Sequence, residues 1–258
     1  MKTVFDWVTE GSPLSFFTED ILSTAEFSNI KRIQSQGPIN INQFEKSKTH
    51  FHRWPLESSQ QVLSLFSQKT EKVLLINAFD CLIPRTTGHG EIQFWPDLII
   101  LDVLKKMVRE KVKTLNLNSF VYIIGESAWV RVLSAVAAQL GFANIIIVGT
   151  DHQSLLPHLL ILKKNLMGIK FQSVLVQELT LQPQHAGLVF NAMNLSEQKE
   201  SLQDIAYFNF MQSEGLFVNL MADSGQKLLH DEAERAQLQI INSQQIELAW
   251  WKNLNQLA

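Results

Sequence analysis

The stretch from residue 121 to residue 151 constrains the fold more than any other part of this 258-residue chain. An apolar run at Val121–Ile124 ends before a glycine, and a second apolar run follows at Ile145–Val148. Between them, an amphipathic pattern from Ala128 to Leu140 predicts a helix that also stops at a glycine. Strand, helix and strand within about 30 residues form a βαβ unit, the building block of a parallel sheet with a dinucleotide crevice.

The turn between the first strand and the helix lacks two of the three glycines of a phosphate-binding loop. Such a loop reads Gly-x-Gly-x-x-Gly because bare backbone must approach the pyrophosphate at a helix N-terminus. Its six positions here are Gly125, Glu126, Ser127, Ala128, Trp129 and Val130. Glu126 would place a carboxylate beside the phosphates, and Trp129 would fill space that the ligand needs. The turn therefore predicts the fold and argues against a bound nucleotide.

The composition is that of a soluble globular protein, with 46% hydrophobic and 18% charged residues. The net charge of −3 gives no reason to expect nucleic acid as a partner. No apolar run reaches the ~18 residues that a membrane span needs, and the N-terminal residues lack the pattern of a signal peptide. Cys81 is the only cysteine, and we interpret it as a small buried side chain. These features predict a cytoplasmic protein.

Short strand and helix patterns alternate over the first hundred residues. The short apolar run Val73–Ile76 is interpreted as a strand, and the turn-rich segment 81–96 predicts a hairpin. A helix predicted over Leu98–Val112 then leads into the βαβ unit.

This order of elements predicts an α/β fold with two lobes. Residues 1–100 would form an N-terminal α/β domain of the substrate-binding type, and residues 101–242 a C-terminal Rossmann-like domain with a parallel sheet. The last helix, within residues 243–257, could return to the first lobe.

Laid in order, these elements resemble the shikimate dehydrogenase family over most of the chain. The segment Gly11–Asp20 resembles the family's Gly-x-Pro-Ile-x-His-Ser-x-Ser-Pro, and Gly125–Gly141 has the family's spacing from the phosphate glycine to the helix-ending glycine. The other matches are short motifs in the family's order: Trp54–Glu57, Ala78–Leu82, Trp95–Asp97 and Asn191–Asn194, with Arg131 at the family's arginine position. The resemblance implies a two-domain fold built for reducing a ketone with NADP.

Several positions that the resemblance assigns to the substrate carry a different kind of residue. The two serines that hold the substrate carboxylate fall on Phe17 and Glu19. An aromatic ring offers no hydrogen bond, and a carboxylate repels an anionic substrate. The asparagine for a substrate hydroxyl falls on Asp80, and the glutamine that completes the site falls close to Trp250. These four residues are expected to line the substrate cleft.

The catalytic pair of the family is also changed. Its proton-transfer lysine falls on Glu57, whereas its aspartate is retained as Asp97. Glu57 beside Asp97 would be a like-charge pair, in which one carboxyl could hold a proton near neutral pH. No nearby lysine replaces Glu57, because the next candidates are Lys46 and Lys48. Alternatively, Asp97 caps the helix that begins at Leu98.

The positions implied for the cofactor are Gly125, Glu126, Ser127, Ala128, Asp151 and Asn191. The family's Asn-Arg-Thr, which grips the adenosine 2′-phosphate, reads Gly149-Thr150-Asp151, so no arginine is left to pair with that phosphate. Asp151 could bind a ribose hydroxyl as in NAD sites, or could cap the following helix. We expect no cofactor, or NAD or NADP if the chain is an enzyme of altered specificity.

His50 and His52 are two residues apart, which places both imidazoles on one face of a strand. A metal site would need a third ligand, and the sequence offers none nearby. We therefore expect no metal and interpret the pair as part of a surface strand.

These departures favour a shikimate dehydrogenase-like protein that has lost this activity and acts as a non-catalytic binding or regulatory protein. Its partner would be another protein of unidentified kind, and the chain could be a monomer or a homodimer. A first alternative is an NAD(P)-dependent oxidoreductase of altered specificity that uses Asp97 and Glu57. A second alternative is a small-molecule sensor that binds its ligand between the lobes.

Overall fold

The computed structural model describes residues 1–8, 13–14, 27–34, 41, 44–112, 116–194, 199–221 and 223–257. Their contacts divide the chain into two compact units, each with its own sheet. Unit 1 comprises the described residues of Met1–Glu10, Phe17–Ile100 and Trp250–Ala258, and unit 2 those of Gly11–Phe16 and Leu101–Ala249. The predicted α/β class, with a separate sheet in each part of the chain, is confirmed.

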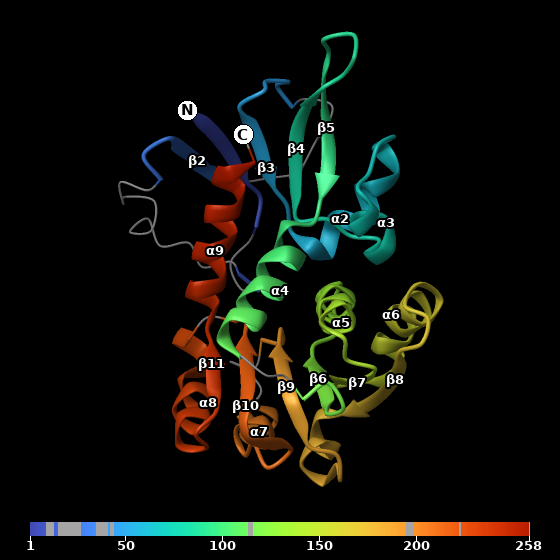
Figure 1. Cartoon of the computed structure of the whole chain (residues 1–258), viewed down its shortest axis with the longest axis vertical. Coiled ribbons are helices and arrows are strands. Elements are labelled where there is room, and N and C mark those ends of the chain that lie inside the picture. The colour runs from blue at the N-terminus through green and yellow to red at the C-terminus, as the bar shows by residue number, and fades with distance from the viewer. Residues whose placement is uncertain are drawn as a thin grey trace. The chain divides into compact units, whose positions relative to one another are not determined.

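Unit 1 contains a mixed five-stranded sheet in the order β2-β1-β3-β4-β5 (Figure 1). The first three strands run parallel, and β4 and β5 form the hairpin that the sequence predicts. The strands are β1 (Lys2–Asp6), β2 (Ile30–Gln34), β3 (His50–Arg53), β4 (Cys81–Thr86) and β5 (Ile92–Asp97). Two short helices, α2 (Leu56–Val62) and α3 (Glu71–Ile76), and the 3-10 turn η3 (Leu63–Leu65) lie between β3 and β4.

The strand expected at Val73–Ile76 is wrong, because these residues belong to helix α3. The helix begins after Thr70 and ends where Asn77 adopts a left-handed conformation with φ of 57°. A run of four apolar residues does not by itself distinguish a strand from a turn of buried helix. Only Val73 and Ile76 are buried within this segment, a spacing of three that belongs to a helix.

Unit 2 contains a six-stranded parallel sheet in the order β11-β10-β9-β6-β7-β8 (Figure 1). Because the chain moves outward from β6 to β8 and then returns to β9 beside β6, the order reverses there, as in Rossmann folds. The strands are β6 (Phe120–Ile124), β7 (Asn144–Gly149), β8 (Lys170–Leu175), β9 (Ala186–Asn191), β10 (Met211–Asn219) and β11 (Gln239–Ile241). Its helical segments are α5 (Trp129–Leu140), α6 (His152–Asn165), η4 (Val176–Leu181), α7 (Lys199–Ala206) and α8 (Asp223–Arg235). Two further helices are shared between the units: α4 (Ile99–Lys111) begins in unit 1 and continues in unit 2, and α9 (Ser243–Gln256) begins in unit 2 and belongs to unit 1 from Trp250 on.

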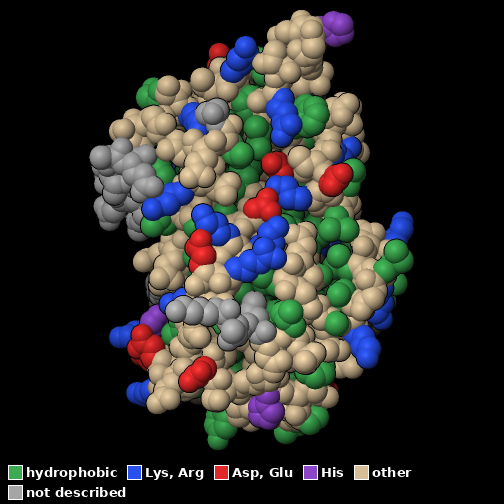
Figure 2. All heavy atoms as spheres, in the orientation of Figure 1, with side chains coloured by type: hydrophobic (Ala, Val, Ile, Leu, Met, Phe, Trp, Pro, Cys, Tyr) green, Lys and Arg blue, Asp and Glu red, His purple; other side chains and the backbone are tan. Residues whose placement is uncertain are grey.

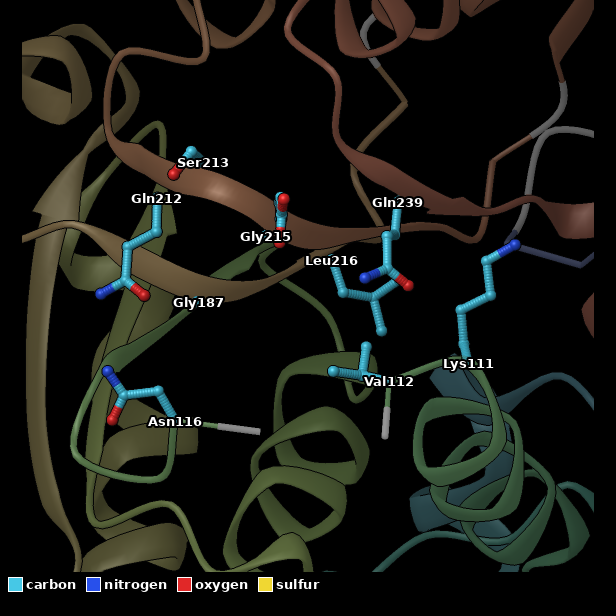
Figure 3. A pocket seen from close by; sticks show the side chains of 10 residues that line it. Lys111, Val112, Asn116, Gly187, Gln212, Ser213, Gly215, Leu216 and Gln239 are labelled. Atoms are coloured by element: carbon cyan, nitrogen blue, oxygen red, sulfur yellow. The ribbon is translucent and has the colours of Figure 1, made fainter. Parts of the chain in front are cut away.

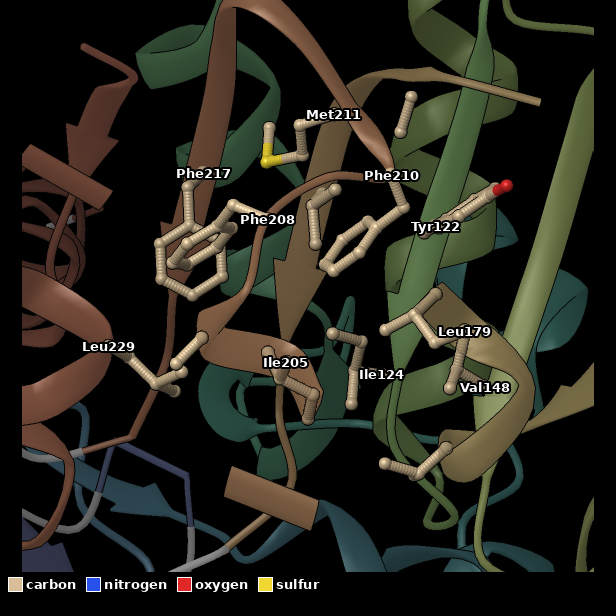
Figure 4. Close-up of a cluster of buried hydrophobic side chains, with 14 of the residues drawn as sticks. Tyr122, Ile124, Val148, Leu179, Ile205, Phe208, Phe210, Met211, Phe217 and Leu229 are labelled. Carbon is tan, nitrogen blue, oxygen red and sulfur yellow. The ribbon is translucent and has the colours of Figure 1, made fainter. Parts of the chain in front are cut away.

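A buried aromatic cluster covers one part of this sheet (Figure 4). The rings of Phe208 and Phe217 meet edge to face at 5.0 Å, and Tyr122 stacks on Phe210 at 5.8 Å. The Tyr122 hydroxyl donates a 2.6 Å hydrogen bond to the carbonyl of Gln184, and burial raises the pKa of Tyr122 to about 12. Such packing fixes the strands to one another, so that the carboxyl ends of β6, β7 and β9 form a rigid edge.

Basic and acidic side chains are interspersed over the face of the molecule drawn in Figure 2, in keeping with the net charge of −3. Among the helices of the described residues, none combines the length and the apolar character that a membrane span requires.

His52 lies inside unit 1 rather than on a surface strand. It is 2% exposed and stacks against Phe44 at 4.0 Å and Phe5 at 5.0 Å. The indole N–H of Trp7 donates to its Nδ1 over 3.3 Å. Burial, with a smaller contribution from His50, lowers the pKa of His52 to about 3. The interpretation of this strand as a surface strand is therefore wrong at His52, whose imidazole is a neutral part of the core.

Replacing His52 with Phe should make the protein less sensitive to acid. In the unfolded chain a histidine takes up a proton near pH 6.5, whereas the folded chain resists protonation down to about pH 3. The stability that neutral His52 contributes is therefore lost progressively as the pH falls from about 6.5 toward 3. From pH 8 to pH 5 the wild type should lose about 2 kcal/mol more unfolding free energy than His52→Phe.

Urea unfolding of both proteins at the two pH values measures this difference, and the contributions of the other titrating groups cancel. Identical losses in the two proteins would show that His52 is protonated in the fold.

Candidate functional site

The carboxyl edge of the sheet in unit 2 is where proteins of this architecture bind nucleotides. Here the side chain of Glu126, the second residue after β6, reaches across to the turn that follows β7. Its Oε1 accepts hydrogen bonds from the Thr150 hydroxyl at 2.6 Å, from the Asp151 N–H at 3.2 Å and from the Thr150 N–H. A Cβ atom placed on Gly149 would lie 3.0 Å from the same oxygen. The carboxylate thus lies over the last residue of β7 and joins the two turns.

Asp151 is the N-cap of helix α6. Its Oδ2 accepts the N–H of Ser154 at 3.1 Å, and the Ser154 hydroxyl donates back to the Asp151 carbonyl at 2.7 Å. Of the two interpretations of this residue, the structure therefore shows the cap. One carboxylate oxygen remains near the carboxyl end of β7, next to the contact made by Glu126.

The start of helix α5 uses the remaining residues of the predicted cofactor turn. Gly125 donates its N–H to the Val148 carbonyl at 2.9 Å, and the Ser127 hydroxyl accepts the N–H of Trp129 at 3.3 Å. Ala128 is the N-cap and contributes no side-chain hydrogen bond. A Cβ on Gly125 would make ordinary contact with Ala192 at 3.6 Å, so the packing does not demand a glycine there. Trp129 is buried at 4% exposure.

Two more side chains hold this turn from the side. Nδ1 of His158, on α6, lies 3.0 Å from a guanidinium nitrogen of Arg131, on α5. The imidazole also hydrogen-bonds the backbone of Glu126. Burial first, and then the neighbouring Arg131 charge, lower the pKa of His158. A neutral imidazole can therefore join α5, α6 and the turn at the same time.

Asn191 lies fully buried at the end of β9. Its amide donates to the side-chain oxygen of Asn219 at 3.0 Å, and its own oxygen accepts the N–H of Met193 at 3.2 Å. Asn219 likewise accepts the N–H of Met221 at 3.2 Å. This pair of asparagines ties the ends of β9 and β10 together.

In unit 1 the structure brings Asp80 and Trp250 into direct contact. The indole N–H of Trp250, which is 2% exposed, donates to Oδ2 of Asp80 at 2.7 Å. The same carboxylate accepts the backbone N–H groups of Ile99 at 2.7 Å and Ile100 at 2.8 Å. Burial raises the pKa of Asp80 to about 6, although these hydrogen bonds oppose the rise.

The N–H groups that open helix α4 therefore find their acceptor in Asp80, and not in Asp97 as the alternative interpretation held. The backbone N–H that Asp97 accepts is that of Leu98, the residue before the helix, at 2.8 Å. A capping aspartate can come from a distant part of the chain, which a local sequence pattern does not reveal.

The charged partner of Asp97 is Lys72, which the sequence analysis overlooked. Its ammonium lies 2.9 Å from Oδ1 of Asp97, and the Thr70 hydroxyl donates to the same oxygen at 3.1 Å. Lys72 is on α3 with 27% of its side chain exposed, whereas Glu57 is exposed in the first turn of α2. Asp97 was expected to lie beside the Glu57 carboxylate, but it forms an ion pair with Lys72 instead. In such a pair the lysine can exchange a proton.

The other predicted site residues contribute less. Phe17 and Glu19 lie outside the described residues. Across the part of the chain that the structure describes, His, Cys, Asp and Glu side chains form no group of three that could hold a metal ion. Cys81 is buried, and burial raises the pKa of its thiol.

A groove of about 430 Å³ lies at the opposite, amino edge of the same sheet (Figure 3). Gly187 on β9 and the irregular segment of β10 before Leu216 form its floor, and polar side chains surround it. Those side chains include Asn116, Gln212, Ser213, Glu214 and Gln239. None of these residues stood out in the sequence, because amide side chains at strand starts form no recognisable motif.

Removing the two capping carboxylates should affect stability to different extents. Asp80→Ala leaves two helix N–H groups and one indole N–H without their acceptor in a buried place, at a cost of about 3 kcal/mol. Asp151→Ala, the matched change at an exposed helix start, should cost about 1 kcal/mol because water can replace the lost acceptor. Urea unfolding at pH 7 measures both values. Equal losses would contradict the assignment of Asp80 as the buried cap of α4.

A scan against protein-family models and a search of curated proteins found no match for this chain. Solved structures do match it over almost its whole length. The dehydroquinate dehydratase and shikimate dehydrogenase from S. pombe is 11% identical with a TM-score of 0.70, over 98% of this chain and 49% of its own. This chain thus spans about half the length of that protein.

Two further matches cover most of both chains. Quinate dehydrogenase from Corynebacterium glutamicum, in complex with NAD, is 11% identical with a TM-score of 0.67, over 98% of this chain and 93% of its own. The 5-ketofructose reductase of Gluconobacter sp. strain CHM43 is 12% identical with a TM-score of 0.69, over 99% and 92%. At such low identities the likeness concerns the fold. The chain has the shikimate dehydrogenase-like fold that its sequence predicted.

Proposed function

We propose that this chain is a non-catalytic binding or regulatory protein that uses the shikimate dehydrogenase-like fold without its NADP-dependent chemistry, and that its partner is another protein. One observation carries the proposal. The polar side chains at the carboxyl edge of the parallel sheet, those of Glu126, Asp151 and Asn191, are each hydrogen-bonded to groups of the chain itself.

A dinucleotide does not fit the residues present at this edge. Its adenosine ribose needs open hydrogen-bonding groups at the carboxyl end of the second strand of the βαβ unit, which is β7 here. Here the N–H groups after β7 donate to Glu126, and a second carboxylate, that of Asp151, stands next to them. A 2′-phosphate would meet two negative charges in place of a cation.

The substrate side supports the same proposal. By the resemblance, Asp80 takes the position of the asparagine that holds a substrate hydroxyl. Its carboxylate instead accepts three N–H groups of unit 1. Trp250 is bonded to it and is buried. Two of the four residues expected to line the cleft therefore belong to the packed interior and offer a substrate little access.

Calorimetric titration with NADP(H) and NAD(H), with and without shikimate, should give no binding at millimolar nucleotide. The expectation follows from the occupied N–H groups and the two carboxylates at the edge. A shikimate dehydrogenase from Listeria monocytogenes titrated in parallel, whose solved structure contains shikimate and NAD, is the positive control. Micromolar binding of either nucleotide by this chain, or turnover of shikimate, would contradict the proposal.

The ion pair of Lys72 and Asp97 favours a second candidate, an NAD(P)-dependent oxidoreductase of altered specificity. A partly exposed lysine in contact with a buried aspartate can share a proton for a substrate oxygen. Solved structures of similar fold carry the names of quinate dehydrogenase and 5-ketofructose reductase, so the fold serves oxidoreductases named for substrates other than shikimate. In this candidate Lys72 takes the place that the sequence analysis gave to Glu57.

Any activity found in a panel of polyols and keto sugars with NAD(H) should fall about 100-fold or more in Lys72→Met, because the proton donor is removed. Lys69→Met, which changes a partly exposed lysine three residues away, is the matched control and should keep full activity. Activity that persists in Lys72→Met would reject this candidate, as would a panel without any turnover.

A further inference from the structure

Three of the hydrogen bonds at the carboxyl edge share one acceptor atom. Three donors of the turn after β7, the Thr150 N–H, the Thr150 hydroxyl and the Asp151 N–H, all point to Oε1 of Glu126. Two are backbone groups that must be satisfied by some acceptor, whether water, a side chain or a ligand. In this chain the acceptor is supplied from within.

The position of this carboxylate matters because of the strand order. β6 and β7 are neighbours in register, with Ile124 opposite Val148. Gly149 follows directly on Val148, and Glu126 lies two residues after Ile124. In Rossmann sheets the adenosine ribose lies between the ends of these two strands, beside the acidic residue after the second one. Oε1 of Glu126 would lie only 3.0 Å from a Cβ atom on Gly149, so this oxygen stands in ribose space.

The backbone and the side chain of Glu126 are held by different partners. His158 hydrogen-bonds the backbone of Glu126, and Arg131 supports His158 at 3.0 Å. The side chain is only half-buried, and its partners Thr150 and Asp151 are exposed. Replacing the side chain therefore leaves the turn in place and frees three hydrogen-bond donors.

We propose that Glu126 is the specificity-determining residue of this edge: it acts as an internal competitor that keeps a dinucleotide out. The inference rests on the proposed function and adds that nucleotide exclusion depends on this one side chain. Without it, the edge accepts an adenosine with a free 2′-hydroxyl, as in NAD(H). NADP(H) stays disfavoured because the Asp151 carboxylate faces the 2′-phosphate and no arginine compensates it.

The test is a titration with NADH and NADPH, followed by nucleotide fluorescence, of the full-length wild type, Glu126→Ala and Glu126→Ser. Two small replacements are used so that one folding failure does not end the experiment. Both should bind NADH at least about tenfold more tightly than the wild type, and NADH more tightly than NADPH. Adding Asp151→Asn should reduce that preference between the two nucleotides.

Two controls are matched to these variants. The first tests whether the space that the Glu126 side chain fills is what excludes the nucleotide, and the second tests whether losing a different glutamate has the same effect. Glu126→Gln keeps the size of the side chain and an oxygen that can accept from Thr150, so it should gain much less than Glu126→Ala. Glu178→Ala removes another glutamate that accepts a backbone N–H, that of Leu175 at 3.1 Å, and should gain nothing.

The outcomes distinguish this inference from the proposed function. Wild-type protein that already binds NADH at micromolar concentration would overturn both. The wild type and the folded variants Glu126→Ala and Glu126→Ser could all fail to bind NADH at millimolar concentration. That result would agree with the proposed function and overturn the role of Glu126. Equal gains in Glu126→Ala and Glu178→Ala would also overturn it, because the effect would not be specific to Glu126.

Discussion

Backbone N–H groups at the ends of strands and the beginnings of helices need acceptors, and in this chain they find them in the chain's own carboxylates. Glu126 satisfies the turn after β7, Asp151 begins α6, and Asp80 closes the start of α4. In a nucleotide-binding protein such groups are kept available for the ligand. Two of these carboxylates, Glu126 and Asp151, lie at the carboxyl edge of the parallel sheet, where proteins of this architecture bind nucleotides.

Much of the fold follows from the sequence, because its central strands are buried on both faces. The apolar runs that become β6 and β7, separated by an amphipathic helix between glycines, leave little room for another arrangement. The hairpin of β4 and β5 follows in the same way from its turn residues. The pattern at Val73–Ile76 is misleading because four apolar residues suit a short buried helix as well as a strand.

The candidate site is less predictable, because its contacts join residues far apart in the chain. The sequence identified Glu126 as unsuitable for a phosphate but could not show that Thr150 and Asp151 satisfy it. Likewise, Lys72 was overlooked because it lies on the helix whose apolar residues suggested a strand, fifteen positions from the residue expected to carry the charge. Asp80 and Trp250, 170 residues apart, meet only in the fold.

A crystal structure of the wild-type protein grown with millimolar NADH would show whether the carboxyl edge excludes a dinucleotide. We expect no nucleotide there, with Oε1 of Glu126 still accepting from Thr150 and Asp151. Density for a dinucleotide between the ends of β6 and β7, with the Glu126 side chain turned away, would contradict it.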